Sequence, residues 1–257
     1  MSNSAETVPV LSVSYLGMTR MKGRLKSAVW ATGATAVFFG INAGASAFTA
    51  WFYFRILTLS YVYGWGHIPA EIYPISLTMI EPLFNIVGWV QIAAFFAANI
   101  AILVALTAAR RGLEKIIGEA SFYHGWGWTI GSLFIPFWSL YRPWVGFAEV
   151  RRAALGVAKR GRVSMEWKSD GFSFSTFCLA LTWIFGTAAL KALGGEIERT
   201  LGVQNFGVPQ VEVAMHLFSV DTAIRLFIAG FCFWYLRGII KAMQSVLKMS
   251  TSADVFN

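Results

Sequence analysis

The stretch Ser27–Phe54 reads SAVWATGATAVFFGINAGASAFTAWFYF, 28 residues without a charged side chain between Lys26 and Arg55. A transmembrane helix needs roughly 20 apolar residues to cross a hydrocarbon core of about 30 Å. This stretch is therefore long enough to cross a bilayer as one helix.

Three further stretches have the same character. Pro82–Ala109 is uncharged over 28 residues, Gly171–Leu190 is uncharged over 20, and Val213–Leu236 is interrupted only by Asp221 and Arg225. The last stretch qualifies if its two charges lie near one end or pair with each other. The sequence predicts four transmembrane helices, at about residues 27–54, 82–109, 171–191 and 214–237.

The composition supports a membrane protein. Of the 257 residues, 56% are hydrophobic and 13% are charged, about half the usual share for a soluble domain. A soluble protein of this size cannot bury so much apolar surface, and a disordered chain would contain far less of it. Two cysteines are too few for a disulfide scaffold or a cysteine-rich metal site.

A fifth uncharged stretch, Ala120–Tyr141, differs from the others. Eight of its 22 residues are aromatic, and it contains Pro136 in its second half. Tryptophan and tyrosine favour the headgroup level, and a proline inside a helix kinks it. These features favour a re-entrant or interfacial helical element over residues 122–147 rather than a fifth span.

The basic residues agree with this interpretation. Seventeen of the 21 lie before Ser27, after Ala109, between Tyr141 and Lys168, or after Leu236. Four spans place all these segments on one side, which is the cytoplasmic side by the positive-inside rule. We expect an all-α polytopic membrane bundle with both termini cytoplasmic. Five spans are the alternative, and they would divide the basic segments between the two sides.

The predicted organisation has three parts. Residues 1–26 form a basic cytoplasmic segment, residues 27–241 a membrane domain, and residues 242–257 a C-terminal tail. Residues 147–168 are expected to form a basic amphipathic helix at the cytoplasmic leaflet. A signal peptide cleaved near Ala45-Ser46-Ala47 is the less favoured alternative, because the preceding basic segment is long and apolar residues continue beyond the site.

Small residues recur at four-residue steps in the first two spans. They are Ala36, Gly40 and Gly44 in the first, and Ala93, Ala97, Ala101, Ala105 and Ala109 in the second. Small side chains let helix backbones approach closely in lipid. We expect both rows to pack within the bundle, with a dimer face as the alternative. We expect Asn42, Gln91 and Asn99 to form hydrogen bonds between helices.

No enzyme motif is present. The chain lacks HExxH, a Walker motif, GxSxG and a dinucleotide fingerprint. Its three histidines are not opposed within spans, which disfavours haem. Cys178 and Cys232 are expected to behave as small hydrophobic residues. The sequence predicts no enzyme, no cofactor and no metal site.

Asp221 and Arg225 are the strongest candidates for a functional site. They lie four residues apart, so they share a helix face and can pair. A charge inside a membrane span is a functional hypothesis by default. The competing interpretation is a structural ion pair near the outer end of the helix, shallow enough to reach the membrane surface.

One motif resembles a known family. The run WTIGSLFIPFWSLYRP, residues 128–143, resembles the bacterial DUF4328 family in the residues Trp128, Phe134, Ile135, Pro136, Arg142 and Pro143. The basic pair after Ala109 and the charged residues Glu149, Arg151 and Arg152 fit it as well, whereas Trp138-Ser139 departs from it. The resemblance implies a multi-span bacterial membrane protein of unknown molecular function.

Physically, the motif suits a re-entrant turn. Pro136 would break one short helix, and Pro143 can begin the next. Arg142 is expected to face headgroup phosphate or a carboxylate.

Together, these observations predict an integral protein of the bacterial inner membrane. We expect a non-enzymatic scaffold or regulatory component, whose basic cytoplasmic face contacts anionic lipid headgroups or a protein partner and not nucleic acid. The alternative is a small transporter or channel with a polar path through Asp221, Arg225, Asn42 and Asn99. An enzyme acting on lipid would need a nucleophile and a base, and no such pair is evident.

Overall fold

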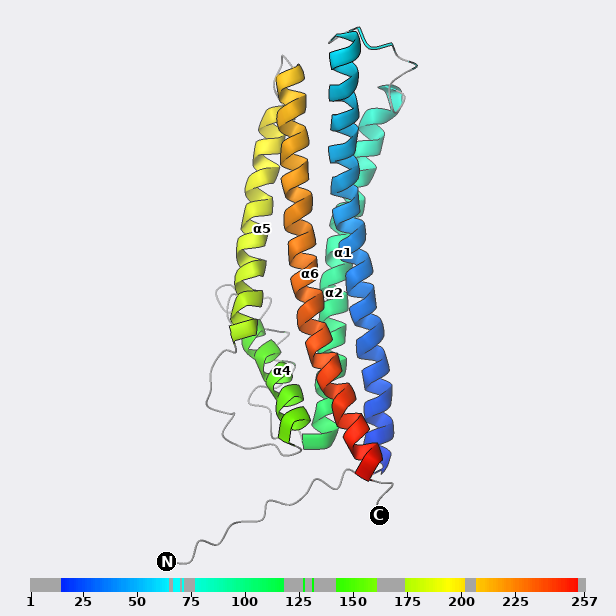
Figure 1. Cartoon of the computed structure of the whole chain (residues 1–257), viewed down its shortest axis with the longest axis vertical. Helices are drawn as coiled ribbons and strands as arrows, with labels where there is room; N and C mark the ends of the chain where they lie inside the picture. Colours follow the sequence, from blue (N-terminus) through cyan, green and yellow to red (C-terminus); the bar gives the residue numbers. More distant parts are fainter. Residues whose placement is uncertain are drawn as a thin grey trace, which may run out of the picture. The chain divides into compact units, whose positions relative to one another are not determined.

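The computed structural model describes residues 15–64, 67–69, 71, 77–117, 127, 131, 142–160, 174–201 and 207–253. Five helices make up this part of the chain: α1 (Tyr15–Tyr63), α2 (Leu77–Ile117), α4 (Arg142–Arg160), α5 (Phe174–Leu201) and α6 (Val208–Ala253) (Figure 1). Within these ranges there is no strand, so the predicted all-α class is confirmed for the described residues.

Four of these helices are long and apolar enough to cross a membrane. The candidate spans are Arg20–Tyr63, Pro82–Lys115, Thr176–Thr200 and Val208–Ser245. The predicted spans lie inside these helices wherever the structure describes them. The helices are longer than predicted: the 49 residues of α1 extend roughly 70 Å, well beyond a hydrocarbon core. Lysine and arginine are good helix formers, so their presence outside the apolar stretch does not end the helix.

The predicted re-entrant element falls almost entirely outside the described residues. Trp128 and Pro136 lie outside the described residues. Arg142 and Pro143 are the first two residues of α4. Proline suits the first turn of a helix because its missing N–H has no partner there. The expectation that Pro143 begins a helix is therefore confirmed.

The helix ends show local capping. Gly64 follows α1 with a φ of 80°, in the left-handed region that glycine adopts without strain. Its N–H donates to the Ser60 carbonyl at 3.0 Å, as in a C-terminal cap. At the start of α6, the Gln210 side chain accepts a hydrogen bond from the Gly207 N–H at 3.0 Å. These bonds satisfy backbone groups that a helix terminus leaves without an intrahelical partner.

The chain divides into two compact units. Unit 1 comprises Met1–Thr32, Ile102–Cys178 and Trp234–Asn257, and unit 2 comprises Gly33–Ala101 and Leu179–Phe233. Helix α4 lies wholly in unit 1, whereas α1, α2, α5 and α6 contribute residues to both units. We describe each unit separately.

Aromatic side chains dominate the core of unit 2. Tyr53 on α1 stacks on Phe218 of α6, with ring centroids 5.7 Å apart and an interplanar angle of 11°. Trp183 brings α5 to α2 by stacking on Phe95 at 6.0 Å. Pairs of this kind add about 0.5–1.5 kcal/mol beyond the burial of their area. Aromatic contacts therefore join all four helices that contribute to this unit.

A glycine of α2 lies at a close contact between helices in unit 1. A Cβ atom on Gly112 of α2 would lie 2.8 Å from the Cε of Met243 and 3.5 Å from the Cβ of Arg24. Met21 and Leu113 are fully buried beside this contact. The absence of a side chain at residue 112 therefore leaves space for Met243 of α6, and α1 lies within van der Waals distance of the same position.

The predicted packing of the first row of small residues was wrong. Ala36, Gly40 and Gly44 are exposed on α1. A Cβ atom on either glycine would meet no atom within 4 Å. Within this chain, the described residues bury other positions of α1, including Phe39, Asn42 and Ala43. The buried face of α1 is therefore offset by about one residue from the face that carries Ala36, Gly40 and Gly44.

The second row is buried over only part of its length. Ala101, Ala105 and Ala109 are buried, but Ala93 is exposed, and Ala94 and Ala98 are buried in its place. An α-helix has 3.6 residues per turn, so each four-residue step turns about 40° beyond a full circle. From Ala93 to Ala109 the drift reaches about 160°, so the row cannot stay on one face.

Candidate functional site

The charged pair of α6 forms as its spacing predicted. Arg225 donates from Nε to the Oδ2 of Asp221 at 2.6 Å and from Nη2 to Oδ1 at 3.0 Å. This bidentate geometry matches the planar fork of the guanidinium group to the carboxylate. The two residues are four apart, so one turn of the helix brings their side chains together.

Two side chains of α1 complete the coordination of this pair. Arg225 also donates from Nη1 to the Oδ1 of Asn42 at 2.6 Å. The Ser46 hydroxyl donates to the Oδ2 of Asp221. Asn42 and Ser46 are themselves four residues apart, so one face of α1 meets the paired face of α6.

The second helix joins through its backbone. The side-chain amide of Asn42 donates from Nδ2 to the Gln91 carbonyl of α2 at 2.7 Å. The buried polar network, defined here as Asp221, Arg225, Asn42, Ser46 and the Gln91 carbonyl, therefore ties α6, α1 and α2 together. The expectation that Asn42 bonds between helices is confirmed.

Most of the network is buried within unit 2, and the Arg225 side chain is 17% exposed. Asp221 is 4% exposed, Asn42 is 2% exposed and Ser46 is fully buried. The Arg225 guanidinium is directed at α1 by its bond to Asn42, not toward a helix end. Asp221 and Arg225 lie 13 and 17 residues after Val208, so they are roughly 20–26 Å along the axis of α6. The pair occupies the middle of the candidate span Val208–Ser245.

Asn99 was expected to form a hydrogen bond between helices, but it does not join the network. Its side-chain Nδ2 donates to the Phe95 carbonyl at 2.8 Å, one turn earlier on α2. This bond satisfies the amide within its own helix. The described contacts therefore give a compact cluster around Asp221 rather than a continuous polar path from Asn42 to Asn99.

A second polar cluster lies in unit 1 around Tyr235 of α6. The Tyr235 hydroxyl donates to the Phe147 carbonyl of α4 at 2.9 Å and lies 3.0 Å from the Thr176 hydroxyl of α5. Arg151 of α4 donates to the Tyr235 carbonyl at 3.2 Å and stacks its guanidinium over the Tyr235 ring at 4.8 Å. Tyr235 is 1% exposed, so it acts as the central anchor of three helices.

This anchor also explains the amphipathic pattern of α4. The apolar residues Trp144, Phe147, Val150 and Ala154 are all buried within unit 1. Gly238 of α6 leaves space for Arg151, because a Cβ atom there would lie 2.7 Å from Nη1. The apolar face of α4 therefore packs against protein. The sequence pattern alone had suggested that this face lies in the lipid leaflet.

The described residues offer no metal site. No group of three or more His, Cys, Asp or Glu side chains in the described ranges is placed to hold a metal ion. Cys178 is half-buried and Cys232 is buried, and both carry free thiols.

Comparison with known proteins supports the sequence resemblance. Residues 76–194 match the family model of a domain of unknown function, DUF4328. The resemblance to DUF4328 is therefore confirmed over these residues. The matched residues include α2, α4 and the first part of α5, and with them the Gln91 carbonyl of the network. No curated protein and no solved structure matches the chain. Asp221, Arg225, Asn42 and Ser46 lie outside the DUF4328 match.

Proposed function

We propose that this protein is a non-enzymatic component of the bacterial inner membrane, a scaffold or regulator that contacts anionic lipid headgroups or an acidic partner through unit 1. Helices α1, α2, α5 and α6 are the four spans. An even number of spans returns the chain to the side where it began, so both termini are cytoplasmic in this proposal.

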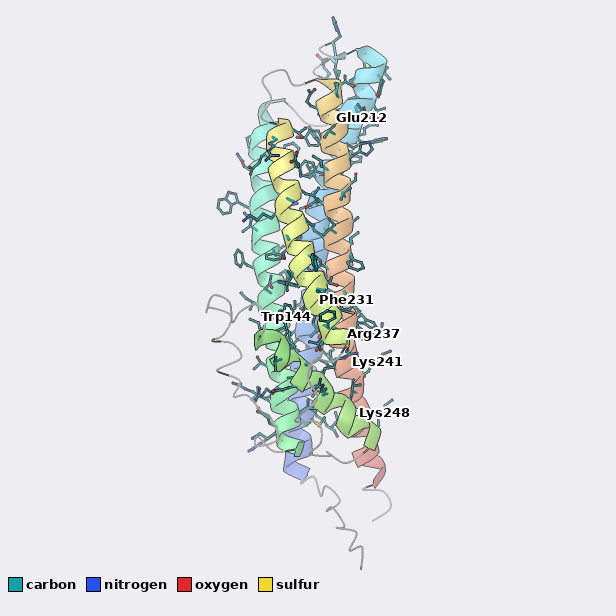
Figure 2. All side chains as sticks on the ribbon, turned by 90° about the vertical axis from the view of Figure 1, so that its left-hand side faces the viewer. Trp144, Glu212, Phe231, Arg237, Lys241 and Lys248 are labelled. Atoms are coloured by element: carbon teal, nitrogen blue, oxygen red, sulfur yellow. The ribbon has the colours of Figure 1, made fainter. Side chains whose placement is uncertain are left out.

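The observation that carries the proposal is the charge of the two units. Among the described residues, unit 1 contains two acidic residues, Glu114 and Glu149, and fifteen basic ones. These basic residues are Arg20, Lys22, Arg24, Lys26, Arg110, Arg111, Lys115, Arg142, Arg151, Arg152, Lys159, Arg160, Arg237, Lys241 and Lys248. Three of them, Arg237, Lys241 and Lys248, follow one another along the C-terminal part of α6 (Figure 2).

Unit 2 has the opposite balance. Its described residues carry four basic groups, Arg55, Lys191, Arg199 and Arg225, and six acidic groups, Glu71, Glu81, Glu196, Glu198, Glu212 and Asp221. Basic residues remain in the cytoplasm when a membrane protein inserts, and they are attracted to the anionic cytoplasmic leaflet of the membrane. The contrast supports a cytoplasmic position for unit 1, and in this proposal the connection between α2 and α4 lies on the same side.

The buried polar network fits a structural role in this proposal. Both carboxylate oxygens of Asp221 accept hydrogen bonds, and all three guanidinium nitrogens of Arg225 donate. A charge pair in a span is tolerated when its partners satisfy it completely. We infer that the network fixes the register of α6 against α1 and α2.

Transport is the second candidate function, favoured by one observation. Asp221 carries a carboxylate in the middle of a candidate span, in contact with a serine hydroxyl that can exchange a proton. Intramembrane carboxylates of this kind mark proton and ion pathways in many transporters. A proton flux across vesicles that Asp221→Asn abolishes would favour this candidate over the structural role.

Lipid selectivity tests the leading proposal. The protein would be placed in phosphatidylcholine vesicles containing spin-labelled phosphatidylglycerol or spin-labelled phosphatidylcholine, and the motionally restricted fraction of each label would be measured. We expect preference for the anionic lipid, weaker at high salt because ions screen surface charge. Equal restricted fractions for the two lipids would contradict the proposal.

Two matched triple variants locate the contact. Lys22, Lys26 and Lys241 are exposed in unit 1, and their replacement by glutamine should reduce the preference, since each basic residue near an anionic surface contributes about 1 kcal/mol. Replacement of Arg55, Lys191 and Arg199 in unit 2 removes the same charge and should leave the preference unchanged. Equal losses in the two variants would show that net charge, not unit 1, determines the preference.

A further inference from the structure

We propose that a groove between α1 and α2 in unit 1 is a specific binding site for the phosphate group of an anionic ligand. This inference rests on the proposed contact of unit 1 with anionic headgroups and deepens it, because it replaces a diffuse charged surface with a defined site.

The groove has the size of a small-ligand site. It is open to the surface, has a volume of about 640 Å³, and is lined by Arg20, Gly23, Arg24, Ser27, Arg111, Glu114 and Lys115. Pockets that hold small molecules occupy about 300–1,000 Å³. A Cβ atom on Gly23 would meet nothing within 4 Å, so the wall contributed by α1 is open at this residue.

Helix periodicity and the packing of α1 against α2 bring the four basic side chains together. Arg20 and Arg24 are four residues apart on α1, and Arg111 and Lys115 are four apart on α2, so each pair occupies one helix face. Beside Arg111, a Cβ atom on Gly112 would lie 3.5 Å from the Cβ of Arg24, so α1 and α2 are close neighbours at this level. The two faces therefore meet across one groove.

The groove is electropositive despite the carboxylate in its wall. Glu114 accepts a hydrogen bond from the Nε of Arg110 at 2.7 Å, and the Arg110 side chain is only 3% exposed. A buried guanidinium thus balances this carboxylate, whereas the four basic groups of the lining are exposed. Three of these four are arginines, whose guanidinium fork binds phosphate oxygens in pairs.

The position of the groove along both helices matches the depth of lipid phosphates. Ser27 is the first residue of the uncharged stretch of α1, and Arg111 comes directly after the uncharged stretch and Arg110 on α2. Helices pass from hydrocarbon to headgroup where their uncharged stretches end. A phospholipid presents its phosphate at this level, and a soluble phosphate-bearing molecule reaches it from the aqueous side.

Thermal unfolding of the purified full-length protein in detergent tests the site. Dioctanoyl phosphatidylglycerol, dioctanoyl phosphatidylcholine and inorganic phosphate would be titrated separately while tryptophan fluorescence reports the Tm. We expect a saturable rise in Tm with phosphatidylglycerol and none with phosphatidylcholine, because a ligand that binds only the folded state stabilises it by mass action. A saturable rise with inorganic phosphate as well would assign the site to soluble phosphates, and a rise with the lipid alone would assign it to the membrane.

Two groove variants and one matched control make the test specific. Arg20→Gln/Arg24→Gln and Arg111→Gln/Lys115→Gln each remove two charges from one wall, and both should abolish the saturable rise. Arg55→Gln/Lys191→Gln removes two exposed charges from unit 2, outside the groove, and should retain it. The Tm of each variant without ligand reports whether it folds, and the two groove variants alter different helices.

Three results would overturn the inference: no saturable rise in the parent, a rise that both groove variants retain, or an equal loss in the control variant. The spin-label measurement separates this failure from failure of the proposed function. If anionic preference persists in vesicles without a saturable site, unit 1 contacts lipid diffusely and only the groove is wrong.

Discussion

At the scale of single residues, the buried polar network joins particular faces of α6, α1 and α2 in unit 2. A buried ion pair contributes little net stability by itself, because desolvating two charges offsets their attraction. Its effect here comes from its partners, since Asn42 and Ser46 bind the pair from another helix. Removing one charge would leave the other buried without its counterpart.

The first prediction concerns Asp221 and Arg225. Asp221→Asn or Arg225→Gln alone should lower stability by about 3–5 kcal/mol, and the double variant should lose less than the sum of the two. The measurement is a double-mutant cycle on thermal or denaturant unfolding in detergent. Strictly additive losses would mean that the two side chains are not coupled.

An exposed ion pair of the same unit provides the control. The Nη1 of Arg199 and the Oε1 of Glu196 on α5 lie 2.6 Å apart, and the side chains of Glu196 and Arg199 are 56% and 78% exposed. Pairs in contact with solvent contribute about 0–1 kcal/mol. The cycle of Glu196→Gln and Arg199→Gln should therefore show almost no coupling, and a large value would point to a general charge effect.

The sequence predicts part of this network. The pairing of Asp221 with Arg225 follows from a spacing of four residues on one helix, which is local information. The contribution of Ser46 and of the Gln91 carbonyl depends on which helices are neighbours and at what register, which one sequence does not contain. One signal was available: Asn42 and Ser46 repeat the four-residue spacing on α1.

At the scale of helices, burial follows the true helical period and not a four-residue step. Along α2, Ala94, Ala98, Ala101, Ala105, Ala108 and Ala109 are buried. Steps of three and four together average close to 3.6, so these residues stay on the packed side. The sequence correctly predicts that small residues line the contact, but the strict four-residue row misplaces its first members.

The second prediction compares two alanines of one helix. Ala98 is completely buried, so Ala98→Leu should overpack the contact and lower stability by about 1–3 kcal/mol. Ala93 is exposed on the same helix, and Ala93→Leu should leave stability nearly unchanged. Unfolding of both variants in detergent is the measurement. A loss at Ala93 that equals the loss at Ala98 would restore the uninterrupted row.

Helix α4 shows why an amphipathic pattern alone does not identify the surface it meets. Its apolar residues and its basic residues predict either a membrane surface or a protein surface. In the structure this helix meets a protein surface, because Arg151 and the Phe147 carbonyl bind Tyr235 of α6. That contact joins residues 84 and 88 positions apart, far beyond any local spacing.

At the scale of the whole molecule, composition and charge distribution predict most of the architecture. Long uncharged stretches predict four membrane-crossing helices, since little else accommodates them, and the described residues contain four helices long and apolar enough to cross a membrane. The basic residues before Ser27, after Ala109 and after Leu236 gather in unit 1. The groove is not predictable in this way, because it depends on which faces of α1 and α2 meet, and one sequence does not contain that information.

The central claim is that the basic segments of unit 1 share the cytoplasmic side, and topology reporters fused after successive helices test it most directly. Fusions after Ile117, Arg160 and Ala253 should report the cytoplasm, and fusions after Tyr63 and Leu201 should report the opposite side. Opposite signals after Ile117 and Arg160 would contradict the account, because the intervening segment would then cross the membrane and divide the basic residues between its two faces.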